Sequence, residues 1–93
     1  MSVTGMLIEV VGWLGAGMLV LAYGLVSYGY ARSSGAIYQS LNLLGSVFLI
    51  INTAWHGAWP SSALNVVWAV IAVGVLVRIA WTLRRGRSSQ SNG

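Results

Sequence analysis

The sequence predicts an all-α membrane protein, a bundle of three transmembrane helices. Three long apolar stretches occupy most of its 93 residues, 57% of the residues are hydrophobic and only 6% are charged. A hydrocarbon core of about 30 Å requires about 20 apolar residues in helical form, so each stretch is long enough to cross once. Backbone groups in lipid must be hydrogen-bonded within the protein, and continuous apolar runs favour helices over the alternating strands of a barrel.

The first helix is expected at about residues 6–30. No basic residue precedes it and it exceeds the apolar region of a signal peptide, so we expect it to be retained. Glu9, the only acidic residue, lies in an early turn, where a carboxylate suits the positive end of the helix dipole. The alternative is that Glu9 is a proton-coupling group, because acids embedded in membranes commonly serve in proton relays.

The second helix is expected at about residues 36–56. Its polar and small residues recur at the helical spacing i, i+4, i+7, i+11 and i+14, which places them on one face. The residues of this stripe are Tyr38, Asn42, Gly45, Leu49 and Asn52. Small residues such as Gly45 allow helices to approach closely in lipid, so we expect this helix to pack against a neighbour.

The third helix is expected at about residues 62–83, because Pro60 and two serines provide a helix-start signal. Asn65 lies about one turn inside it. An amide exposed to lipid is costly, so Asn42, Asn52 and Asn65 should face protein or a water-filled cavity. They serve either as interhelical hydrogen-bonding groups or as the polar lining of a solute site.

The arginines indicate the topology. Arg32 lies in the first link, and the others lie at or beyond the inner end of the third helix: Arg78, Arg84, Arg85 and Arg87. The positive-inside rule therefore predicts an external N-terminus and a cytoplasmic C-terminus in a cell (inner) membrane. Residues 1–83 form the transmembrane domain, Arg78 snorkels inward, and residues 84–93 are expected to be a basic, disordered tail.

Several function classes are disfavoured. The chain has no cysteine, aspartate or lysine, and no nucleophile motif, so we do not expect an enzyme. His56 is the only histidine and has no second ligand nearby in the sequence, so neither a metal site nor a cofactor is expected. The basic cluster is short and lacks interleaved aromatic residues, so it predicts topology anchoring in the lipid bilayer and no nucleic-acid partner.

Three segments, Leu44-Gly45, Trp59-Pro60 and Asn65-Val66-Val67, resemble the second half of bacterial SemiSWEET sugar transporters of the PQ-loop superfamily. The resemblance covers nearly the whole transmembrane region. It implies a parallel homodimer with a central cavity that is bounded by Asn65. A SemiSWEET-like three-helix bundle is therefore our expected architecture.

The chain departs from the SemiSWEET pattern at two places. Leu25-Val26 stands near the expected position of the Pro-Gln pair in the first helix, and Leu49 stands in place of the sugar-stacking tryptophan. The nearest aromatic residues, Tyr23 and Trp68, would have to substitute. The departures suggest a solute that is smaller or less ring-like than a sugar.

The chain is also similar to a family of small uncharacterised bacterial membrane proteins. That family has an Ala-Tyr-Gly motif, a Tyr-Gln-x-x-Asn-x-x-Gly-Ser motif and a Pro-x-x-x-x-Asn-x-x-Trp motif. They are present here at residues 22–24, 38–46 and 60–68. This match is closer than the first, and it implies no function.

Three hypotheses follow from the sequence. The first is a dimeric transporter for a small neutral polar solute, bound by Asn65 and Asn52 and secondarily by Asn42, Tyr23 and Trp68. An amide supplies both donors and an acceptor, which suits a neutral polar solute. The second hypothesis is a structural or accessory membrane protein, and the third is a proton-coupled exporter that uses Glu9.

Overall fold

The computed structural model describes the backbone of residues 2–92 and the side chains of residues 2–86. Its elements are three helices in chain order: α1 (Val3–Ser27), α2 (Ala36–Trp55) and α3 (Trp59–Asn92). The best 18-residue windows of these helices have mean hydropathies of 1.9, 1.3 and 2.2, which is apolar enough to span a membrane. The predicted all-helical chain, with three helices long and apolar enough to span a membrane, is confirmed.

The ends of α1 and α2 are fixed by local sequence. At the start of α1 the Ser2 hydroxyl accepts a hydrogen bond of 3.0 Å from the Gly5 N–H. Gly29 and Gly57 follow the C-caps of α1 and α2 with φ values of 80° and 70°, a backbone conformation that favours glycine. Each glycine N–H donates to the carbonyl three residues earlier, and the next N–H donates five residues back. This is the Schellman arrangement, which ends both helices sharply.

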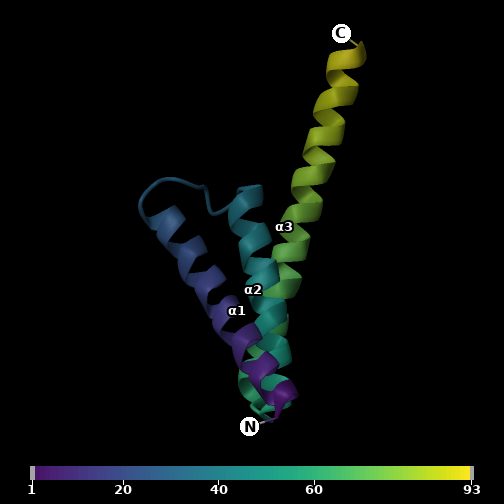
Figure 1. Ribbon diagram of the computed structural model, residues 1–93. Coiled ribbons are helices and arrows are strands. Elements are labelled where there is room, and N and C mark those ends of the chain that lie inside the picture. The colour runs from purple at the N-terminus through teal and green to yellow at the C-terminus, as the bar shows by residue number, and fades with distance from the viewer. Residues whose placement is uncertain (1, 93) are drawn as a thin grey trace.

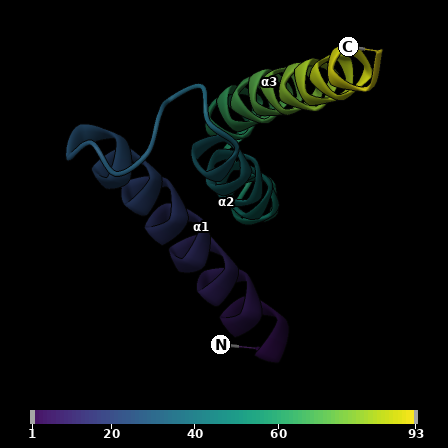
Figure 2. The same cartoon turned by 90° about the horizontal axis from the view of Figure 1, so that it is seen from above.

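Helix α2 lies between the other two helices. It packs against α1 and α3, whereas α1 and α3 make no contact with each other within the described residues. Viewed from above, α1 and α3 lie on different sides of α2 (Figure 2). We call the end with the start of α1 and the α2–α3 turn the Glu9 end, and the end with the α1–α2 loop the basic end; in Figure 1 these are bottom and top.

The α1–α2 contact is built on glycines. A Cβ atom added at Gly15 would lie 2.9 Å from the Gly45 carbonyl oxygen, and one added at Gly45 would lie 2.9 Å from the Gly15 carbonyl oxygen. Gly12 packs still more closely against the Asn52 side chain. Gly17 and Gly24, by contrast, face open space. The part of the predicted α2 stripe from Gly45 to Asn52 therefore packs against α1. This is expected where small residues let helix backbones approach in lipid.

The α2–α3 contact uses the neighbouring face of α2. Gln39 and Ser46 are buried there, seven residues and two turns apart. The buried residues of α3 are also small or polar: Ser62, Asn65 and Ala72. The Ser46 side chain is fully buried, and its hydroxyl has no hydrogen-bond partner within the described residues. Two narrow seams of small side chains thus hold the three helices together.

Helix α3 is longer than the sequence suggested. It begins at Trp59, and its backbone stays helical through Asn92, whereas we expected a helix over 62–83 and disorder over 84–93. Adding a residue to an existing helix costs much less than nucleating one, and no proline interrupts this stretch. Its 34 residues span about 51 Å, so α3 extends beyond a hydrocarbon core of about 30 Å. Arg85 packs over the Trp81 ring at 4.8 Å from the ring centre.

The single chain buries almost no apolar side chain. Ala22 and Ala72 are the buried hydrophobic residues of the described chain, and most large apolar side chains are exposed. In water such a surface would be unstable, but lipid accommodates it. The exposed apolar surface therefore faces lipid or another membrane-embedded chain.

Candidate functional site: two polar regions at opposite ends

The first polar region lies at the Glu9 end. His56 caps the C-terminus of α2, and its Nε2 atom lies 3.1 Å from Oε1 of Glu9 on α1. Both side chains are about half exposed, at 50% and 44%. When Nε2 carries a proton, His56 donates a hydrogen bond to the carboxylate. The only acid and the only histidine of the chain thus form a pair that joins α1 to α2.

No sequence pattern predicts this pair, because Glu9 and His56 are 47 residues apart. The sequence offers the helix dipole or proton coupling as roles for Glu9, and it indicates no partner for His56. Antiparallel packing of α1 and α2 brings them together. Within the described residues, no third histidine, cysteine or carboxylate joins the pair.

Asn52 lies one turn before His56 and also joins the two helices. Its Nδ2 group donates a hydrogen bond of 2.9 Å to the Ile8 carbonyl oxygen of α1. That carbonyl belongs to the turn that carries Glu9. The amide donor is therefore used within the chain, and the packing of Gly12 on Asn52 fixes the position of the side chain.

A notch of about 270 Å³ opens beside this bond. The residues that line it are Glu9, Gly12, Trp13, Ala16 and Asn52. Small residues make room, Trp13 supplies an exposed aromatic face, and Glu9 supplies a carboxylate. The notch runs from Glu9 to Ala16, about 10 Å along α1, so it leads from the polar groups near the end of the helix into its apolar part.

Asn65 lies in a different interface. It is 9% exposed on α3, which packs against α2 alone within the described residues. Its Nδ2 group donates a hydrogen bond of 3.0 Å to the Ser61 carbonyl oxygen of its own helix. Asn52 instead faces α1. The expectation that Asn52 and Asn65 share one interior is therefore not met within a single chain, because α2 stands between the two seams.

The remaining predicted residues are spread over the surface. Asn42 is half-buried on α2, whereas Tyr23 on α1 and Trp68 on α3 are 72% and 50% exposed. One chain does not gather them with Asn52 around a common cavity. Any site that uses Tyr23 and Trp68 requires surfaces contributed by another molecule.

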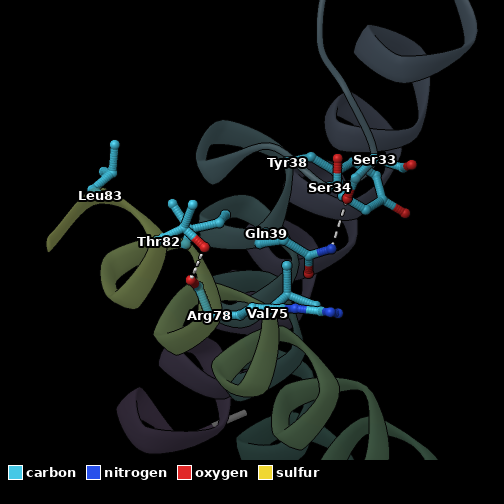
Figure 3. Close-up of a pocket in the computed structure, with 9 residues that line it drawn as sticks. Ser33, Ser34, Tyr38, Gln39, Val75, Arg78, Thr82 and Leu83 are labelled. Atoms are coloured by element: carbon cyan, nitrogen blue, oxygen red, sulfur yellow. Dashed lines mark hydrogen bonds between the residues drawn. The ribbon is translucent and has the colours of Figure 1, made fainter. Parts of the chain in front are cut away.

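The second polar region is a cavity of about 630 Å³ at the basic end, between the α1–α2 loop, the start of α2 and the second half of α3. The residues that line it are Ser33, Ser34, Tyr38, Gln39, Val75, Arg78, Ile79, Thr82 and Leu83 (Figure 3). The Gln39 Nε2 group donates a hydrogen bond of 2.7 Å to the Ser33 carbonyl oxygen, which ties the loop to α2. In Figure 3 the Arg78 side chain extends from α3 toward the α2 side of the cavity.

Sequence reasoning missed most of this cavity. We assigned Arg78 to snorkelling and gave Gln39, Ser33 and Ser34 no role. One signal was present, because Gln39 and Ser46 are seven residues apart and so share a helix face beside the predicted stripe. The folding of the loop back against α3 could not be read from that spacing.

The predicted topology anchors lie at one end of the molecule. Arg32 is exposed in the α1–α2 loop, and Arg84 and Arg85 are exposed on α3. The side chain of Arg87 lies outside the described side chains. Basic residues therefore cluster at the end opposite to Glu9.

Comparison with known proteins identifies a family. A protein-family model matches residues 8–85, so the chain belongs to this uncharacterised family, and the match includes α2 and most of α1 and α3. No curated protein and no solved structure matches the chain. The family match does not link the chain to SemiSWEET or other PQ-loop proteins.

Proposed function

We propose that two copies of this chain form a small membrane permease for a neutral polar solute. The observation that carries the proposal is the notch at the Glu9 end, which brings a carboxylate and an amide into a helix surface that is otherwise apolar. Lipid-facing polar groups are costly, and polar residues within membrane segments commonly mark solute pathways. A SemiSWEET-like dimer is part of the same proposal.

The arrangement of the helices supports a second copy. Helices α1, α2 and α3 form a row in which the outer two do not touch, so one chain encloses no pathway. Gly17 and Gly24 of α1 and Gly74 of α3 face open space, which leaves room for another helix to approach. A second chain that covers the notch would convert it into a passage between two protein surfaces.

The notch favours small neutral solutes. Asn52 retains its amide oxygen as an acceptor after donating to Ile8, and the Glu9 carboxylate accepts hydrogen bonds as well. Glu9 already interacts with His56, so a cationic solute is not required to balance the Glu9 carboxylate. Hydroxyl or amide groups of a solute are suitable donors to both acceptors.

The orientation that belongs to this proposal places the Glu9 end outside and the basic end in the cytoplasm of a bacterial inner membrane. The clustering of Arg32, Arg84 and Arg85 at one end supports it through the positive-inside rule. Trp59 and Trp81 are exposed and 22 residues apart in α3, a separation of about 33 Å that matches two aromatic belts. The notch would then open to the exterior.

A structural or accessory role is the second candidate. The hydrogen bonds of Asn52 to Ile8 and of Asn65 to Ser61 favour it, because both amides donate within the chain. In this role the notch is a packing defect filled by lipid or by a partner side chain. A proton-coupled exporter is the third candidate, and there the Glu9–His56 pair would exchange protons with the exterior.

The proposal can be tested by osmotic swelling of proteoliposomes, with glycerol and urea as neutral probes. Ala16→Phe places a bulky ring in the notch and changes no polar group, so permeation should fall to the rate of protein-free liposomes. Ala80→Phe adds the same ring at an exposed position of α3 outside the notch and should leave permeation unchanged. Circular dichroism and crosslinking verify that both variants fold and self-associate.

Three outcomes discriminate between the candidates. Equal permeation by wild type, Ala16→Phe and protein-free liposomes would favour the structural role. Permeation that responds to an imposed pH gradient and is lost in Glu9→Gln would favour proton coupling. A wild-type chain that stays monomeric in nanodiscs at every protein-to-lipid ratio would end the dimeric proposal.

A further inference from the structure

The cavity at the basic end is lined by a positive charge that has no acidic side chain near it within the described residues. Arg78 lines the cavity, and Glu9 is the only acidic side chain in the sequence. Glu9 is paired with His56 beyond the far end of α2, a helix of about 30 Å. Arg78 is exposed, so an anion that approaches from outside the protein can reach its guanidinium group.

The other groups around the cavity also favour an anion. Ser33 and Ser34 carry hydroxyl groups beside the first turn of α2. The N-cap of that helix is Gly35, which provides no side-chain cap, so N–H groups of the first turn remain available. Tyr38 of this first turn lines the cavity, whereas the two residues before it line a separate hollow, so Arg78 and the two serines are the groups that face an anion here.

The shape of the cavity indicates what carries the anion. Its α3 wall runs from Leu83 to Val75, about 12 Å along the helix, and the apolar side chains of Val75, Ile79 and Leu83 form much of it. Arg78 is about 28 Å from Trp59 along α3, which is the depth at which the hydrocarbon core gives way to headgroups. A cation beside an apolar wall at that depth matches a molecule with an anionic head and a hydrocarbon chain.

We propose that this cavity binds an anionic phospholipid, with Arg78 contacting the headgroup phosphate, Ser33 and Ser34 bordering the headgroup, and the acyl chain lying along Val75 and Ile79. Arginine suits phosphate because its planar guanidinium can donate two parallel hydrogen bonds. Gln39 holds the loop serines in place through its bond to the Ser33 carbonyl oxygen. This site is independent of transport, because it lies at the opposite end from the notch.

The test measures which lipid stays on the protein. Wild-type protein is reconstituted in nanodiscs with equal amounts of phosphatidylglycerol and phosphatidylcholine, extracted in mild detergent and analysed by native mass spectrometry. Retained phosphatidylglycerol should exceed phosphatidylcholine. Arg78→Gln should lower this excess about fivefold, the effect expected for one basic residue at an anionic surface. Arg78→Lys should keep most of the excess, because the charge remains.

Two controls separate the cavity from the general basic surface. Arg84→Gln removes an exposed arginine outside the cavity and should leave the retained excess near the wild-type value. Val75→Phe fills the apolar wall without changing any charge and should lower retention as Arg78→Gln does, whereas Val77→Phe, on an exposed position outside the cavity, should not. If Arg78→Gln loses its helical circular dichroism signal, the comparison of Val75→Phe with Val77→Phe tests the proposal instead. Equal retention of phosphatidylglycerol by these two variants would then contradict it.

Two results would overturn the proposal. In the first, Arg78→Gln and Arg84→Gln lower retention equally, which would mean that only the general charge of the basic end attracts lipid. In the second, inorganic phosphate raises the melting temperature of the detergent-solubilised protein as much as phosphatidylglycerol does, and Arg78→Gln abolishes both effects. The site would then hold a free anion rather than a lipid.

Discussion

The two polar regions differ in where their polar groups find partners. At the Glu9 end, Glu9 lies against His56 and Asn52 donates to the Ile8 carbonyl oxygen, so polar groups of α1 and α2 satisfy one another. At the basic end, Arg78 lines a larger cavity and the chain offers no second acid to neutralise it. The polar groups of the first region have partners within the chain although they stay half exposed, whereas Arg78 in the second region has no acidic side chain near it.

The difference has a physical origin in the helix packing. Glycines at the α1–α2 seam bring backbones close enough for a side-chain amide to reach a carbonyl on the next helix. Toward the basic end α1 diverges from α2 (Figure 1). The cavity there is bordered by a loop and by α3. Close packing thus supplies internal partners at one end, and looser packing leaves room for a ligand at the other.

The largest effect is expected for a substitution that disrupts the close packing of α1 against α2. Gly15→Leu places four side-chain carbons where the Gly45 carbonyl oxygen and the Phe48 Cβ atom already lie within 2.9 Å of an added Cβ. Overpacking of this kind costs about 1–3 kcal/mol or more. We expect the melting temperature in detergent to drop strongly, with loss of the α1–α2 contact.

Gly17→Leu is the matched control, since Gly17 lies two residues away and faces open space. It should leave the melting temperature of the monomer unchanged, although it is free to alter self-association. Equal destabilisation by both variants would mean that the glycine seam does not set the packing at the Glu9 end.

A smaller effect is expected for Asn52→Ala, which removes the bond to the Ile8 carbonyl oxygen. Interhelical hydrogen bonds of this kind contribute about 0.6 kcal/mol on average. We expect a modest fall in unfolding free energy, measured by reversible unfolding in mixed micelles. If Asn52 also lines a solute pathway, glycerol permeation should fall by more than this loss of stability explains. A loss of several kcal/mol would instead make Asn52 a dominant structural residue.

The smallest effect is expected between the two ends, at Ser46. Its hydroxyl is fully buried and has no partner within the described residues, so Ser46→Ala removes an unsatisfied group and loses no observed hydrogen bond. We expect the melting temperature to stay the same or to rise slightly. A marked fall would reveal a hydrogen bond to this hydroxyl that a second chain or a water molecule supplies.

The sequence predicted the helices and their packing faces better than it predicted which helices pack against each other. The apolar stretches indicated the three helices, and the stripe that contains Gly45, Leu49 and Asn52 indicated a packing face. The amides were harder to interpret, because their similar depths suggested a shared interior for Asn52 and Asn65. The structure places one amide against α1 and the other in the α2–α3 seam.

The sequence by itself determined how many times the chain can cross a membrane, since hydropathy is a property of each stretch alone. The helix ends are also local, because Ser2 and the glycines at 29 and 57 act over a few residues, but we expected the first helix at 6–30 and it spans Val3–Ser27. Only the tertiary structure decided that α2 lies in the middle, that Glu9 meets His56, and that Arg78 borders the loop. Lipid-facing and helix-facing surfaces are both apolar, so hydropathy does not specify which helices are neighbours. That choice depends on close contact between small residues far apart in the chain.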